Sequence, residues 1–177
     1  MRRGREPWWF SSSMDGRFDL PAPEGTCYLA MDALGAMLEL IGPEMSSGAV
    51  SKTFLDDRRL RRLSVPRPHR LANLADRRAT GFGVTAEIHT VVPYEMPQAW
   101  AAALRRVGAH GVRYQLRHDP SVKGVGIGLF GKAGLRPGWK RGRELVIDES
   151  LRKMLGDACG IRVLPTPRVS QLRVIDS

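Results

Sequence analysis

The stretch that does most to define the fold is SSSMDGRFDLPAPEGTCYLAMDALGAMLELIGP, residues 11–43. Its first half, residues 11–25, is rich in serine, glycine, proline and aspartate, which favour turns. A short apolar run, Thr26–Ala30, then predicts a strand. Apolar residues follow at the three- and four-residue spacing of a helix, at Met31, Leu34, Met37, Leu38 and Ile41. The segment therefore predicts a turn, a strand and a helix in succession, with a Gly-Pro pair ending the helix.

The rest of the chain predicts short strands mixed with a few helices. Alternation in GVTAEIHTVV predicts a strand over residues 83–92. Residues 97–107 predict a helix, because proline begins the segment and alanine and leucine fill it. Thr53–Leu60 and Leu63–Val65 fit a helix or an edge strand. The other elements expected are strands at 112–116, 125–130, 144–147, 161–164 and 171–175, and a helix at 149–157. This mixture predicts an α+β protein, a single domain over residues 1–177 with small mixed or antiparallel sheets and flanking helices.

Length and composition narrow the class of protein. A chain of 177 residues is large enough to bury a core without disulfides. No stretch approaches the roughly 18 apolar residues of a membrane span, and the basic first ten residues lack the apolar run of a signal peptide. Cys27 and Cys159 are too few for a disulfide framework. We expect a cytoplasmic protein that does not enter a membrane.

The chain is basic, with a formal net charge of +10. Such an excess attracts polyanions through its long-range field. The arginines are densest at Arg58, Arg59, Arg61, Arg62, Arg67, Arg70, Arg77 and Arg78. These residues fit a solvated helix face and connector, or alternatively a nucleic-acid-binding surface. No aromatic residues alternate with these arginines, which weakens a stacking mode of single-strand binding.

Neither the glycine-rich motif of the chain nor its histidines indicate a phosphate-binding loop or a metal site. GIGLFGKA, residues 126–133, departs from the P-loop pattern only at Ala133, which lacks the hydroxyl that holds Mg²⁺. The glycines and proline that follow do not form the helix that a P-loop opens. We therefore expect a strand whose glycines mark the close approach of another backbone. The four histidines lack metal-ligand spacing, so we predict no metal site and expect surface or strand histidines.

The opening segment resembles a known family, the RES domains. Its matching residues are Gly16-Arg17-Phe18-Asp19, Pro21, Gly25–Ala30, Ala36 and Glu39. They follow the family's G-R-F-D, proline-glycine turn, Y-L-A strand and A-x-x-E helix. Residues 98–120, QAWAAALRRVGAHGVRYQLRHDP, resemble its W-A, G-x-x-G-I-x-Y and R-H-D segment, and residues 125–130 resemble its next strand. The resemblance covers most of residues 8–131.

This resemblance implies a fold similar to ADP-ribosyltransferases and the degradation of NAD⁺, often by a toxin paired with a helix-turn-helix antitoxin. In that role Arg17 pairs with the pyrophosphate or ribose-phosphate edge. Tyr28 stacks on the nicotinamide ring, and Glu39 stabilises the oxocarbenium-like charge as nicotinamide leaves. Taken singly, Arg17 would be solvated or paired with a nearby aspartate, Tyr28 would be core and Glu39 would face water.

One departure from the family concerns a serine in its Y-x-S-R-H-D segment. The aligned residue here is Leu116, which can neither donate nor accept a hydrogen bond. The neighbouring Arg117 is a candidate donor to the same substrate. Three hypotheses follow: an NAD⁺ glycohydrolase or phosphorolase, a nucleic-acid-binding module, and a catalytically inactive RES-type fold that binds a partner.

Overall fold

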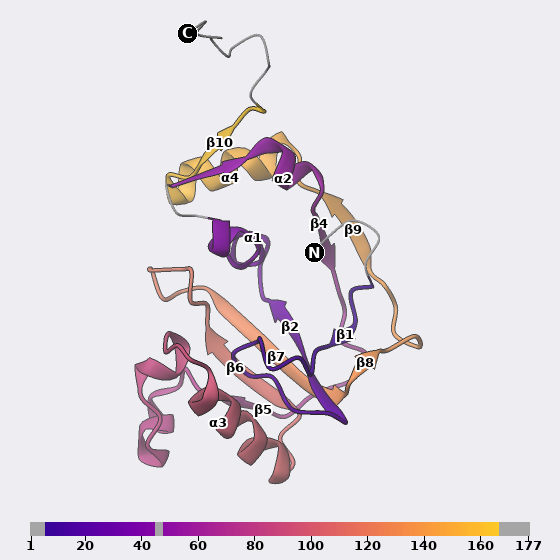
Figure 1. Ribbon diagram of the computed structural model, residues 1–177, viewed down its shortest axis with the longest axis vertical. Helices are drawn as coiled ribbons and strands as arrows, with labels where there is room; N and C mark the ends of the chain where they lie inside the picture. The colour runs from indigo at the N-terminus through magenta and orange to yellow at the C-terminus, as the bar shows by residue number, and fades with distance from the viewer. Residues whose placement is uncertain (1–5, 45–47, 167–177) are drawn as a thin grey trace, which may run out of the picture.

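The centre of the protein is a four-stranded sheet in the order β2-β7-β6-β5. The computed structural model describes residues 6–44 and 48–166. In the sheet, β7 is antiparallel to both of its neighbours, whereas β5 and β6 are parallel. Its strands are β2 (Glu24–Ala30), β5 (Leu71–Asn73), β6 (Gly111–Gln115) and β7 (Val125–Lys132). Small sheets with helices around them confirm the predicted α+β class (Figure 1).

The longest pairing in the sheet joins β2 to β7 over seven residue pairs, from Glu24–Lys132 to Ala30–Gly126. Glycines of β7 permit close packing on one face of this pair. A Cβ atom at Gly126 would clash with the Tyr114 ring, and one at Gly128 would lie 3.2 Å from the side chains of Thr26 and Val112. The strand predicted for residues 125–130 is therefore confirmed. The close neighbours of Gly126 and Gly128 are side chains, however, and not the backbone that we expected.

A hydrophobic core covers this face of the sheet. The rings of Phe18 and Tyr114 contact each other with centroids 4.9 Å apart. Helix α3 (Glu95–Arg106) packs on the same core through Ala101, which is completely buried. The predicted helix at 97–107 thus forms, two residues earlier than expected. Core packing places α3 and the chain around Phe18 on the same face as Tyr114.

A second core lies on the other side of α1 (Ala33–Ile41), which Figure 1 shows between the central sheet and the α2–α4 layer. Met37 and Ile41 of α1 are completely buried there. The side chain of Asp32 caps the helix by accepting a 2.7 Å hydrogen bond from Gly35 N. The other elements around this core are β3 (Ala49–Ser51), α2 (Lys52–Asp56), β4 (Arg59–Arg62), β9 (Arg143–Val146), α4 (Glu149–Cys159) and β10 (Arg162–Leu164).

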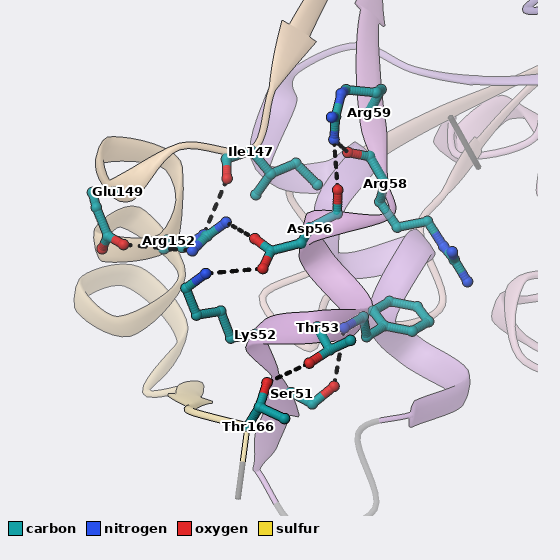
Figure 2. A network of polar contacts seen from close by, with 11 residues as sticks. Ser51, Lys52, Thr53, Asp56, Arg58, Arg59, Ile147, Glu149, Arg152 and Thr166 are labelled. Atoms are coloured by element: carbon teal, nitrogen blue, oxygen red, sulfur yellow. Dashed lines mark hydrogen bonds and ion pairs between the residues drawn. The ribbon is translucent and has the colours of Figure 1, made fainter. Parts of the chain in front are cut away.

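Arg152 connects α4 with α2 in this outer layer, as Figure 2 shows. Its guanidinium donates 2.6 Å and 3.0 Å hydrogen bonds to Asp56 Oδ1 and to the Ile147 carbonyl. Lys52 Nζ contacts the other oxygen of Asp56 at 2.9 Å. Because the Arg152 side chain is only 11% exposed, this network stabilises the layer more than an isolated surface pair would.

A third, smaller cluster covers the opposite face of the sheet. It contains Trp8, Phe10, Cys27 and Leu129, all buried. Around it, β1 (Trp9–Phe10) pairs with β8 (Gly134–Leu135). Burial raises the pKa of the Cys27 thiol to about 12, so this thiol is an inert part of the core at neutral pH.

Two sequence-based expectations need correction, and one is untested. Residues 83–92 do not form a strand: Ala86–His89 is a 3₁₀ turn (η3) that follows another, Arg77–Phe82 (η2). Short-range bonds such as Thr90 N to Glu87 O satisfy the backbone locally, so the alternation has no partner strand. Of the densest arginines, Arg59, Arg61 and Arg62 lie in strand β4 and not on a helix face, whereas Arg77 and Arg78 begin the 3₁₀ turn η2. The strand predicted at 171–175 lies outside the described residues. Within residues 6–44 and 48–166, no helix is both long and apolar enough to cross a membrane.

The packing of Gly126 against Tyr114 can be tested by Gly126→Ala. The added methyl group must displace the buried Tyr114 ring, so we expect a loss of about 1–3 kcal/mol in the free energy of unfolding. Gly138→Ala is the matched control, because a Cβ atom there meets nothing within 4 Å. Urea denaturation measures both variants. Equal stabilities for the two would contradict the close packing described here.

Candidate functional site

Arg17 is held in a buried position between the first turn and the start of α3. Arg17 is 8% exposed. Nη1 donates a 2.8 Å hydrogen bond to the Val91 carbonyl, and the guanidinium lies 4.7 Å from the centroid of the Tyr94 ring. Nη2 is buried without a partner among the described residues. Arg17 is therefore neither solvated nor paired with a nearby aspartate, and its charge is not neutralised by direct contact with a carboxylate.

Tyr94 connects Arg17 with the exposed Arg117. The Tyr94 ring contacts Arg17, and its hydroxyl accepts a 3.1 Å hydrogen bond from Arg117 Nη1. Burial is the main cause that lowers the pKa of Arg17, and Arg117 acts in the same direction. Glu39 acts in the opposite direction on the pKa of Arg17. The predicted residues Glu39 and Arg117 therefore both lie within electrostatic range of Arg17.

Glu39 lies on α1 and contacts the loop that follows β6. Its Oε1 accepts a 3.3 Å hydrogen bond from His118 N and lies 3.3 Å from His118 Nδ1. The His118 ring packs where a Cβ atom of Gly42 would be, at the C-terminal end of α1. The Glu39 side chain is 34% exposed, and its Oε2 has no hydrogen-bond partner among the described residues. One carboxylate oxygen is fixed in place and the other is available.

Tyr28 has a fixed hydroxyl and an exposed flank. The hydroxyl donates a 2.9 Å hydrogen bond to Asp19 Oδ1 and accepts one of 2.8 Å from Phe18 N. Burial of this hydroxyl, followed by the charge of Asp19, raises the pKa of Tyr28 far above its usual range. The residue as a whole is nevertheless 37% exposed. Tyr28 is therefore not a core residue, and its rigidly held ring remains available for stacking.

Tyr114 is the residue that the three predicted site residues share as a neighbour. It is 6% exposed and lies in β6 beside Gly126. Burial raises the pKa of its hydroxyl, Glu39 adds to the effect and Arg17 opposes it. Tyr28 in turn has Tyr114 among the groups that influence its pKa. Tyr28 and Tyr114 lie on the same face of the sheet, and Arg17, Tyr28 and Glu39 each interact electrostatically with Tyr114.

Leu116 occupies the position where a serine was expected, and it is a core residue. It is 3% exposed. Cβ atoms at Gly35 and Gly126 would lie 2.6 Å and 2.8 Å from its methyl groups. The leucine thus fills the space between α1 and β7, next to the helix that carries Glu39.

Four of the eight arginines in the arginine-rich region form ion pairs with local carboxylates. The pairs are Arg58–Asp57, Arg59–Glu144, Arg61–Glu144 and Arg78–Asp76. Arg62, Arg67 and Arg77 are exposed and form no ion pair with the described residues. Nor do the described residues contain a cluster of three or more acidic, histidine or cysteine side chains suited to a metal ion.

Comparison with known families places this site in context. Residues 2–135 match the model of the RES domain. The chain belongs to the RES domain family. This match includes every residue of the site, from Arg17 to His118. No curated protein and no solved structure matches the chain.

Four residues of this RES domain site were not predicted from the sequence: His89, Tyr94, Tyr114 and His118. Tyr114 and His118 lie within the segment that resembled the family, at its Y and R-H-D positions, so that motif could have identified them. His89 is 5% exposed, contrary to the expected surface or strand position. Its Nδ1 is buried without a partner among the described residues. Tyr94 had no sequence signal, because its role depends on contacts with Arg17 and Arg117.

His89 gives a pH-dependent prediction. Burial is the main cause that lowers the pKa of His89, and the charge of Arg17 adds to it. The unfolded chain therefore binds a proton below about pH 6.5 that the folded chain binds less readily. We expect stability to be highest above that pH and to fall as the pH is lowered. In His89→Gln the part of the pH dependence of stability that comes from His89 should disappear. Urea denaturation at pH 5, 6 and 7 measures the free energy of unfolding of both proteins. The same dependence on pH in the variant as in the wild type would contradict the assignment to His89.

Proposed function

We propose that this RES domain cleaves the bond between nicotinamide and ribose in NAD⁺. The RES family is associated with NAD-related toxins. The observation that carries the proposal is the Glu39 carboxylate: His118 fixes one oxygen, and the other is free within electrostatic range of Arg17. A fixed carboxylate with an available oxygen suits a reaction in which positive charge develops on a sugar carbon.

The proposed roles follow from the exposure of each side chain. Tyr28 offers a ring held by Asp19, on which nicotinamide stacks. Arg117 is exposed and reaches the pyrophosphate, whereas Arg17 adds positive charge from its buried position under Tyr94. Glu39 hydrogen-bonds the nicotinamide ribose and stabilises the oxocarbenium-like transition state. Nicotinamide carries a positive charge in NAD⁺ and leaves neutral, so the site supplies position and charge and needs no strong acid.

The acceptor in this reaction is water or phosphate, which makes the protein a glycohydrolase or a phosphorolase. Transfer to a macromolecule is a less favoured form of the same chemistry. A helix-turn-helix antitoxin is the proposed protein partner, and the basic surface suits an acidic face on that partner.

The role of Glu39 is tested by nicotinamide release from NAD⁺, with and without phosphate. We expect Glu39→Gln to lower the rate at least about 100-fold, because one well-placed electrostatic group contributes that much. The fold should persist, since glutamine keeps the oxygen that contacts His118. Glu44→Gln, which changes an exposed carboxylate just beyond α1, is the matched control and should keep the wild-type rate. A wild-type chain that releases no nicotinamide in either condition would contradict the proposal.

The effect of Leu116 is tested by comparing Leu116→Ser with Leu116→Ala. Both variants leave a cavity between α1 and β7, and both should lose about 2–5 kcal/mol of stability. Only serine restores a hydrogen-bonding group. If that group contacts substrate, we expect nicotinamide release to be roughly 2–10-fold faster in Leu116→Ser than in Leu116→Ala. Equal rates would show that Leu116 does not stand in for a substrate contact.

A further inference from the structure

A basic cavity lies at the end of the central sheet away from Glu39. Its volume is about 200 Å³. In the β2–β7 pairing, Gly131 at the cavity lies at the Glu24–Lys132 end, whereas Ala30 at the other end leads into α1. The cavity and the proposed NAD⁺ site are therefore separate. The lining residues are Phe10, Arg67, His69, Arg105, His110, Phe130, Gly131, Arg136 and Trp139.

The lining has positive charge that the protein does not neutralise. None of the lining residues is acidic. Arg105 is paired with Glu24 by two hydrogen bonds of 3.1 Å, but Arg67 and Arg136 have no ion pair among the described residues. Desolvation is the main cause that lowers the pKa of His110, and the neighbouring cationic groups lower it further. Two unpaired guanidinium groups thus face the same small volume.

The two histidines have defined hydrogen-bonding roles in this lining. Their rings are 5.6 Å apart in an edge-to-face arrangement. His69 Nδ1 lies 2.6 Å from the Arg67 carbonyl, so this nitrogen carries a proton. His110 Nδ1 accepts a 3.0 Å hydrogen bond from Arg70 N, so the proton of the neutral ring is on Nε2. His110 therefore has Nε2–H as an additional donor for a ligand.

The wall of the cavity is preorganised by aromatic contacts. The Arg136 guanidinium lies 5.1 Å from the centroid of the Phe10 ring, and Arg136 N donates to the Trp8 carbonyl. Trp139 packs edge-to-face on Trp8 at 4.8 Å. A Cβ atom at Gly131 would lie 2.7 Å from Arg136 Nη2, so glycine leaves room for that guanidinium. Donors held this rigidly lose little entropy when they bind an anion.

We propose that this cavity binds a small anion bearing one or two phosphate groups, of the size of pyrophosphate. Guanidinium groups match phosphate oxygens in charge and in geometry. A volume of about 200 Å³ suits such a compact anion better than a nucleic-acid strand.

The test is calorimetric titration of the full chain with sodium pyrophosphate at constant ionic strength. We expect saturable binding at one site per chain. Arg67→Gln combined with Arg136→Gln should weaken it at least about tenfold, because both charge-assisted contacts are lost. Arg62→Gln combined with Arg77→Gln is the matched control: it removes the same charge from exposed positions outside the cavity and should leave the affinity unchanged.

Parallel titrations identify the source of the phosphate group. Inorganic phosphate and a nucleoside diphosphate, run beside pyrophosphate, show whether the site takes a free anion or the phosphates of a nucleotide. Trp139→Phe should remove any fluorescence change on binding while calorimetry still detects it. The proposal is overturned if pyrophosphate shows no saturable binding, or if both double variants weaken its binding equally. It is also overturned if a short single-stranded RNA binds the chain and pyrophosphate does not.

Discussion

The close packing between β7 and the side chains that cover it is the constraint on which the site depends. Gly126 and Gly128 leave the face of this strand open, so that the buried Tyr114 ring lies directly against the backbone. The rings of Phe18 and Tyr114 then contact each other, which fixes the turn that carries Arg17. Tyr28 pairs with Gly128 in the register of the two strands. A Cβ atom at Gly126 would clash with the Tyr114 ring, so glycine at this position permits the packing on that face.

Glu39 gains its position from both hydrophobic cores. Helix α1 follows β2 directly and buries Met37 and Ile41 against the outer layer. Packing on that side turns the other side of the helix, with Glu39, towards the loop of His118. Part of that outer layer, β9, α4 and β10, lies beyond the residues that match the RES domain. Segments with no residue in the site therefore determine where its carboxylate lies.

The sequence predicted most elements that pack locally, and it failed where contacts between distant segments decide the structure. The strand at 26–30 and the helices at 97–107 and 149–157 were found, because a local pattern or a terminal signal marks each of them. Residues 83–92 alternate like a strand but pair with no other strand. Likewise, Arg17, Tyr28 and Glu39 were selected by a motif, whereas Tyr94 and His89 join the site only through packing. The buried state of Arg17 could not be read from a turn-rich sequence that suggested a solvated side chain.

Leu116 places an apolar side chain where the family resemblance predicts a serine. A leucine is larger than a serine, and here the additional methyl groups lie against Gly35 and Gly126. Leu116 is 3% exposed, so the position contributes to the core and not to hydrogen bonding. Whatever a serine would supply to substrate is missing, yet Glu39, Tyr28 and Arg117 keep their contacts. In the proposed reaction a serine contact would be one hydrogen bond among several binding and electrostatic contributions, so we expect its absence to lower the rate and not to abolish the reaction.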